Sequence, residues 1–191
     1  MRYLNLNKKI LIPLAIIFLL SIFYIFINLF KKTNIVNNTN IVNKTNTRTK
    51  QADYKSIVPG ITTKEQVLSK LGNPVKKTDN LLEYHSNNPN YNNQIQIEED
   101  KVSFIKEYIS LADNRNSKQI TQVYGEPKNI LYGPDANSGF FLYVYPENGI
   151  AYIGHSTSGL LLEIWYFPPT NIDNFMKKYA QEYSEKTKII Q

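Results

Sequence analysis

The sequence predicts an α+β protein in which an N-terminal transmembrane helix precedes two tandem helix-plus-antiparallel-sheet repeats and a C-terminal helix. Three observations lead to this fold class. An uninterrupted apolar run occupies Ile10–Phe30, a short helix signature in Ile57–Pro74 recurs in Asp113–Pro127, and strand-like segments follow each copy. A signature that recurs at a fixed separation indicates an internal duplication.

The first copy of the signature contains a start, a buried face and an end for one short helix. Pro59-Gly60 predicts a turn, after which Thr62 or Thr63 can cap the helix while Glu65 or Gln66 reaches back. The apolar positions at helical spacing are Val67, Leu68 and Leu71. Gly72 is expected to take the left-handed conformation that ends the helix, and Pro74 prevents its continuation.

The second copy has the same parts in the same order. Asn116 and Gln119 take the cap positions, and Gly125 and Pro127 stop the helix. Its apolar stripe consists of Ile120, Val123 and Tyr124. The pairs Val67/Ile120, Leu71/Tyr124, Gly72/Gly125 and Pro74/Pro127 all have the same separation, so the two helices are expected to have equivalent roles.

The first signature, G-x-T-T-K-x-Q-V-L-x-x-L-G-x-P from Gly60 to Pro74, resembles that of the SmpA/OmlA (BamE-like) envelope proteins. The resemblance covers roughly residues 54–168. It implies short helices packed on small antiparallel sheets, with two units in tandem as in the β-lactamase-inhibitor-protein architecture. It also implies a cell-envelope compartment, and a binding or assembly role rather than an activity.

The charge distribution argues against a nucleic-acid-binding domain. The net charge is +6, but residues 1–52 hold eight of the 22 Lys and Arg and none of the 16 Asp and Glu. The remainder is therefore slightly acidic, whereas a nucleic-acid domain carries positive charge on its folded surface. The chain has no cysteine, which excludes disulfides, thiolate metal sites and a lipid-modified N-terminal cysteine. Many SmpA/OmlA proteins are lipoproteins, so attachment here would need another device.

We expect the run Ile10–Phe30 to attach the chain to the membrane, because its length matches the hydrocarbon core of a bilayer. A buried core helix is the alternative, and a cleaved signal peptide is disfavoured because no small-x-small site follows the run. Arg2, Lys8 and Lys9 favour a cytoplasmic N-terminus, although Lys31-Lys32 opposes them. We expect a single-pass membrane protein whose C-terminal part is extracytoplasmic.

The predicted organisation has six parts. They are a cytoplasmic tail at 1–9, the anchor at 10–30, a disordered Asn/Thr linker at 31–52, repeats at 53–112 and 113–169, and a C-terminal helix and tail at 170–191. The predicted strands are Leu81–Ser86, Gln94–Glu98, Val102–Ile109, Phe140–Tyr145, Ile150–Ile153 and Leu160–Phe167.

Alternation along the last strand predicts a binding face. Ile164 and Tyr166 share the core face, which leaves Glu163 and Trp165 on the other, open face because an unpaired buried carboxylate is costly. The same reasoning adds Tyr143 and Tyr145, with Tyr84 at the place of Tyr143 in the first copy. The candidate partner-binding residues are therefore Tyr84, Tyr143, Tyr145, Glu163 and Trp165. Coverage by the C-terminal helix, through Ile172, Phe175 and Tyr179, is the alternative for this face.

The sequence lacks a recognisable catalytic or metal-binding pattern. His85 and His155 stand at non-equivalent positions, and neither has the serine and carboxylate of a catalytic relay. We therefore expect no cofactor, no metal and no catalysis, and a membrane-anchored module that binds an envelope protein or peptide. A cell-envelope enzyme and a structural spacer are the alternatives.

Overall fold

The fold is known from a computed structural model, which describes residues 50–134 and 136–185. The predicted tail and anchor, and most of the predicted linker, lie outside these residues. None of the described helices has the length and apolar character needed to cross a membrane.

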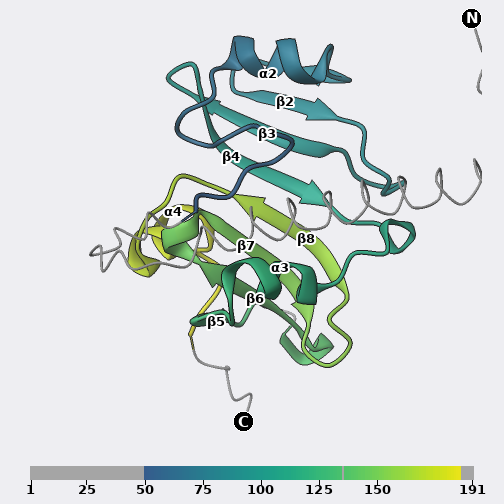
Figure 1. The fold of residues 1–191 in the computed structure, drawn as a ribbon, viewed down its shortest axis with the longest axis vertical. Helices are drawn as coiled ribbons and strands as arrows, with labels where there is room; N and C mark the ends of the chain where they lie inside the picture. Colours follow the sequence, from purple (N-terminus) through teal and green to yellow (C-terminus); the bar gives the residue numbers. More distant parts are fainter. Residues whose placement is uncertain (1–49, 135, 186–191) are drawn as a thin grey trace, which may run out of the picture. The chain divides into compact units, whose positions relative to one another are not determined.

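One antiparallel sheet forms the framework of the described residues (Figure 1). Its eight strands are β1 (Lys76–Lys77), β2 (Leu81–Tyr84), β3 (Asn93–Glu98), β4 (Lys101–Tyr108), β5 (Asn129–Leu131), β6 (Phe140–Tyr145), β7 (Ile150–His155) and β8 (Leu161–Tyr166). The helices are α2 (Lys64–Leu71), α3 (Ser117–Tyr124) and α4 (Ile172–Tyr179), with 3₁₀ turns η1 (Leu111–Asp113), η2 (Ala136–Ser138) and η3 (Pro146–Asn148). The strand order is β1-β2-β3-β4-β8-β7-β6-β5.

The predicted fold class, with two separate tandem sheets, is wrong. The first half of the sheet consists of β1–β4 and the second half of β5–β8. β4 and β8, the last strands of the two halves, pair directly from Ile105 opposite Tyr166 to Tyr108 opposite Glu163. Each would otherwise be an edge strand with unpaired backbone groups, and pairing with the other half satisfies them. The result is one continuous sheet rather than two.

The two halves nevertheless share local geometry. Thr63 caps α2 with Gln66 reaching back, and Asn116 caps α3 with Gln119 in the same way. The register shifts between Gln96 and Ile97 where β3 meets β4, and at the corresponding place, between Ile153 and Gly154, where β7 meets β8. When the two halves are aligned on these register shifts, Lys106 of β4 and Trp165 of β8 occupy equivalent positions. The same two residues are also directly paired where β4 meets β8.

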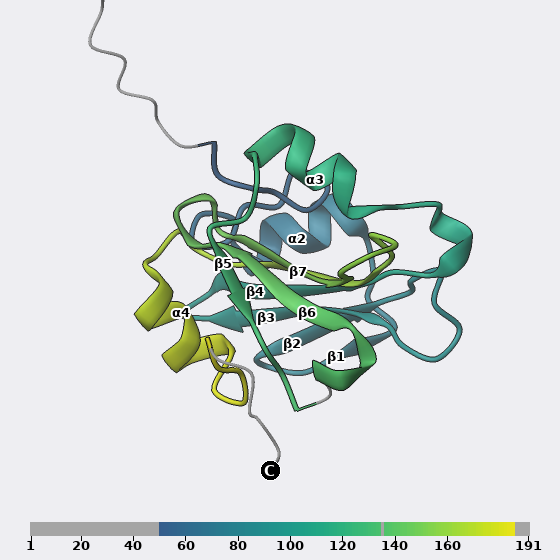
Figure 2. The same cartoon turned by 90° about the horizontal axis from the view of Figure 1, so that it is seen from below.

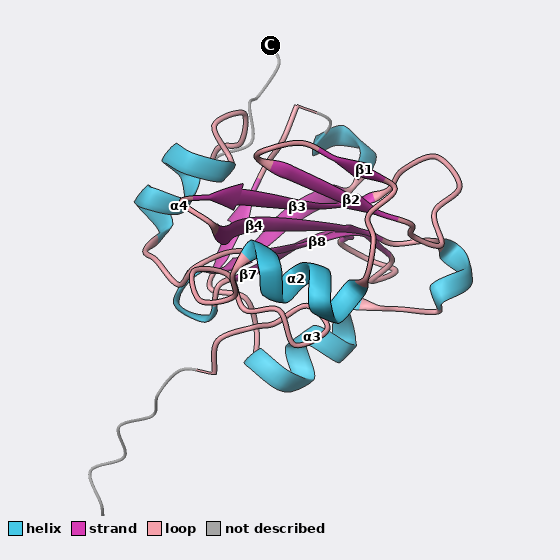
Figure 3. Cartoon of the chain, turned by 90° about the horizontal axis from the view of Figure 1, so that it is seen from above, coloured by secondary structure: helices cyan, strands magenta, loops and turns pink. Residues whose placement is uncertain are grey.

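The sheet is covered on both faces (Figures 2 and 3). α2 and α3 pack on one face, where Val67, Ile105, Ile120 and Ile164 belong to a single core. α4 packs on the opposite face, which we call the α4 face, and Phe175 joins a second core there. The sequence predicted one covered face and one open face, because alternation alone does not show that a later helix returns to the second face.

α4 covers only part of its face, and the sequence explains which part. In the second half the α4 face carries Val144, Ala151, Ile153 and Trp165. The register places Glu83, Gln94, Gln96 and Lys106 at the equivalent positions of the first half. An amphipathic helix buries apolar surface and avoids leaving polar groups unsatisfied, so α4 lies over the apolar half.

Candidate functional site

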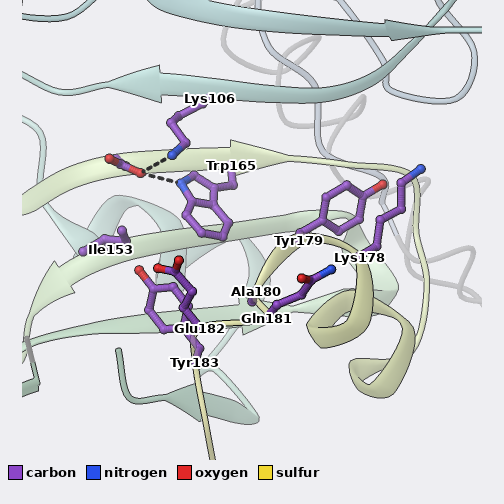
Figure 4. A pocket seen from close by; sticks show the side chains of 10 residues that line it. Lys106, Ile153, Trp165, Lys178, Tyr179, Ala180, Gln181, Glu182 and Tyr183 are labelled. Atoms are coloured by element: carbon purple, nitrogen blue, oxygen red, sulfur yellow. Dashed lines mark hydrogen bonds and ion pairs between the residues drawn. The ribbon is translucent and has the colours of Figure 1, made fainter. Parts of the chain in front are cut away.

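A hollow of about 450 Å³ lies on the α4 face beside the centre of the sheet (Figure 4). Side chains from β4, β7, β8 and the end of α4 line it, and we call it the tryptophan hollow. The lining residues are Lys106, Ile153, Glu163, Trp165, Lys178, Tyr179, Ala180, Gln181, Glu182 and Tyr183. It therefore contains two of the five predicted site residues.

Trp165 forms the inner wall of the hollow and is 4% exposed. Phe104 and Trp165 make an edge-to-face contact with 5.6 Å between ring centroids, and Tyr183 stands perpendicular to the indole at 6.0 Å. Phe175 of α4 lies 6.4 Å away. The indole is thus a core residue with its edge at the hollow, rather than the exposed aromatic that the sequence predicted.

Glu163 is held in place by two charged or polar contacts. Trp165 Nε1–H donates to Glu163 Oε2 at 2.7 Å, and Lys106 Nζ lies 3.4 Å from the same oxygen. The Glu163 side chain is 18% exposed to solvent. Lys106 Nζ also lies 5.0 Å from the centroid of the Trp165 ring, within the range of a cation–π interaction.

The other end of the hollow is fixed by an ion pair between α4 and β3. Lys178 Nζ donates to Glu98 Oε2 at 2.8 Å, and this hydrogen bond raises the pKa of Lys178. Tyr179 lies beside it, stacked on Phe104 at 5.1 Å, and burial raises its pKa. At neutral pH the lysine is therefore charged and the tyrosine neutral.

A second hollow of about 570 Å³ adjoins the first, because Lys178 lines both. Its other lining residues include Glu98, Lys101, Ser103 and Pro168. The Lys178 side chain is therefore common to the two hollows.

The three predicted tyrosines lie on the opposite face of the sheet. Tyr84 and Tyr145 belong to the core beneath α2 and α3, and Tyr143 packs against that core. Tyr84 Oη donates to Gly72 O at 3.1 Å, and Tyr145 Oη donates to Gly125 O at 2.8 Å. Tyr84 therefore corresponds to Tyr145, not to Tyr143, and both fasten the end of a helix to the sheet. The structure does not bring the five residues together on one face.

The histidines do not contribute to the tryptophan hollow. His85 is exposed after the end of β2, and His155 packs against Phe140 at 5.1 Å while its Nδ1 accepts from Ser158 N at 3.2 Å. Within residues 50–134 and 136–185, no group of three or more metal-ligating side chains gathers.

Sequence reasoning missed Lys106, Lys178 and Glu182 as lining residues. The signal for Lys106 is its equivalence to Trp165, which emerges only after the register shifts are aligned. Lys178 and Glu182 come from a segment whose position depends on how α4 returns to the sheet, and no local pattern gives that.

Comparisons with known proteins add one distant likeness. No protein-family profile matches the chain, and no curated protein matches it. Among solved structures, it is similar to a DUF4309 family protein, YjgB, from Bacillus subtilis subsp. subtilis str. 168, at 14% identity and a TM-score of 0.43. The match covers 63% of this chain and 90% of that one. The resemblance to SmpA/OmlA proteins stays a prediction.

Proposed function

We propose that the protein is a membrane-anchored, extracytoplasmic module that binds a polypeptide partner of the cell envelope on its α4 face. The apolar run Ile10–Phe30 would supply the anchor, and the segment after it would tether the folded part. The observation that carries the binding proposal is the pair of adjoining hollows that share Lys178.

The lining of these hollows suits a polypeptide better than a compact ligand. Small-molecule pockets are mostly apolar with few polar groups, whereas lysines, glutamates and a glutamine border these hollows. Tryptophan and tyrosine at the inner wall, with charged groups around them, reproduce the apolar centre and polar rim of protein interfaces.

A structural spacer is the second candidate, and the burial of Trp165 under α4 favours it. A spacer needs a stable fold and no contact with a partner at the hollow. The two functions therefore differ in what touches the residues at the end of α4.

Site-specific photo-crosslinking in the full chain tests the proposal. A photoreactive residue at Gln181, which lines the tryptophan hollow, should give a discrete adduct in intact cells. The matched control places the same residue at Ser69, an exposed position of α2, whose helix lies on the opposite face. Charge reversal at Lys178 should abolish the Gln181 adduct. Absence of any adduct from Gln181, or equal adducts from both positions, would overturn binding and leave the spacer.

A further inference from the structure

The junction between β4 and β8 has the symmetry of a contact between two copies of the same strand. When the halves are aligned on their register shifts, Lys106 is equivalent to Trp165, and Glu107 is equivalent to Tyr166. Lys106 and Trp165 are also paired with each other, so an approximate twofold axis passes between them. The β4 strand of a second copy would therefore fit in the place of β8, with one Lys106 opposite the other.

The side chains at the axis on the α4 face suit only the pairing of β4 with β8. Lys106 Nζ lies 5.0 Å from the Trp165 ring centroid and 3.4 Å from Glu163 Oε2. In a pairing of two β4 strands, two ammonium groups would face each other, and like charges directly opposite in a sheet are destabilising. Neither ammonium would have its carboxylate, because the residue of β4 that is equivalent to Glu163 is Phe104.

The side chains at the axis on the opposite face show the same complementarity. Tyr166 Oη donates to Glu107 Oε2 at 2.8 Å, and Arg115 Nη1 donates to Glu107 Oε1 at 2.6 Å. The Glu107 side chain is 12% exposed. In a pairing of two β4 strands, two such carboxylates would meet with no hydroxyl between them. A largely buried carboxylate that loses a hydrogen-bond donor costs free energy.

We infer that Lys106 and Glu107 make β4 pair with β8 of its own chain rather than with β4 of a second copy. Backbone hydrogen bonds cannot make this choice, because equivalent strands offer the same N–H and C=O groups. Selection between two such partners needs side chains that penalise the wrong one. This inference is independent of the proposed function, because it concerns the pairing of two copies and not a ligand of the hollows.

Capture of one copy by another during refolding tests the inference. Two forms of the full-length protein with different affinity tags are unfolded together in urea and refolded by dilution into a non-ionic detergent. After isolation on the first tag, the amount of the second tag measures pairing between copies. We expect Lys106→Met to raise this amount at least threefold over wild type, and the increase should grow with protein concentration.

Two control variants separate the choice of partner from a loss of stability. Glu163→Gln breaks the same ion pair but leaves Lys106 on β4, so it should not raise capture. Lys101→Met removes a lysine from β4 outside the residues that pair with β8, and it should not raise capture either.

A matched pair of variants tests the other face in the same way. Glu107→Gln and Tyr166→Phe both alter the hydrogen bond between these two side chains. Only Glu107→Gln removes the charge from β4, so only this variant should raise capture.

A substituted cysteine shows whether the copies pair through β4, because the natural chain has no cysteine. Directly opposed residues of antiparallel strands have Cα atoms about 4.5–5.5 Å apart, which a disulfide can span. Position 106 would face itself across the axis, so Lys106→Cys should give at least threefold more disulfide-linked dimer than Lys101→Cys in oxidative refolding.

Three results would each overturn the inference. They are wild-type capture by Lys106→Met, an equal increase for Lys106→Met and Glu163→Gln, and equal dimer yields from the two cysteine variants. The first would show that Lys106 does not oppose pairing between copies. The second would assign the effect to stability alone, and the third would show that copies associate elsewhere than at β4.

Discussion

The Lys106 ammonium lies 5.0 Å from the Trp165 ring centroid, and the two residues are direct partners across the β4–β8 junction. They also occupy equivalent positions in the two halves of the sheet. Two lysines at this point would repel each other, and two tryptophans would compete for the same space. The two halves instead carry a cation and an aromatic ring at this point, which attract each other.

Truncation of Trp165 should be costly to the fold. Because the side chain is 4% exposed and contacts Phe104, Phe175 and Tyr183, we expect Trp165→Ala to lower the free energy of unfolding by about 3–5 kcal/mol. Urea unfolding followed by far-ultraviolet circular dichroism measures this. Leu111→Ala, at a residue that is 77% exposed, is the control and should change stability little. A Trp165→Ala protein of wild-type stability would contradict the observed coverage by α4.

The hydroxyls of Tyr84 and Tyr145 should make similar contributions. Each donates to the carbonyl of a helix-terminal glycine, so Tyr84→Phe and Tyr145→Phe should each destabilise by about 1 kcal/mol. Tyr91→Phe, on an exposed ring, is the matched control. Chemical denaturation of the three variants gives the comparison, and a neutral effect in either half would break the equivalence of these two tyrosines.

Gly72 and Gly125 should resist any side chain. Their φ, ψ values are 75°, −155° and 79°, −169°, a region that is essentially confined to glycine. This differs from the left-handed helical conformation that the sequence predicted, although φ is positive as expected. An added Cβ meets nothing within 4 Å, so the cost of Gly72→Ala or Gly125→Ala is backbone strain, about 1–3 kcal/mol. Thermal unfolding measures this cost, with Ser69→Ala at an exposed position of α2 as the control. Equal melting temperatures of the glycine variants and the wild-type protein would refute the strain.

Asp113 should make η1 sensitive to acid. Its carboxylate accepts from Asn87 Nδ2 and from Ser110 N, and these bonds, with that of Asn87 the larger cause, lower its pKa. Because the pKa of Asp113 is lower in the folded state than in the unfolded state, its carboxylate contributes its full stabilisation above the unfolded-state pKa. This stabilisation is lost as the pH falls through the folded-state pKa. The unfolding midpoint of wild type should therefore fall more steeply in acid than that of Asp113→Asn. Parallel pH profiles of the two proteins would show that these bonds add nothing to stability.

Local features of the fold were predictable because they depend on neighbours in sequence. The capping boxes at Thr63 and Asn116 follow from residues three apart, and the bounds of β6 follow from alternation. The merging of the two sheets was not predictable, because β4 carries no local sign that its free edge will meet β8. The two-residue strand β1 is too short to show any period.

The candidate site was predictable only in part, for a related reason. Alternation correctly separated Glu163 and Trp165 from Ile164 and Tyr166. It could not decide which face of β6 corresponds to which face of β8, since that depends on the register through β7. The tyrosines were therefore assigned to the wrong side.

The position of β8 at the centre of the sheet governs how the chain can fold as it emerges from a ribosome or a translocation channel. β4 is complete at Tyr108, but its second neighbour arrives only with Leu161–Tyr166. Through that interval the nascent first half exposes an unpaired strand, which is a template for aggregation. The charged side chains of that strand are Lys101, Lys106 and Glu107, and charge on an unpaired strand disfavours pairing with another chain. Lys106, which contacts Trp165 in the folded protein, therefore also protects the unpaired strand against aggregation during synthesis.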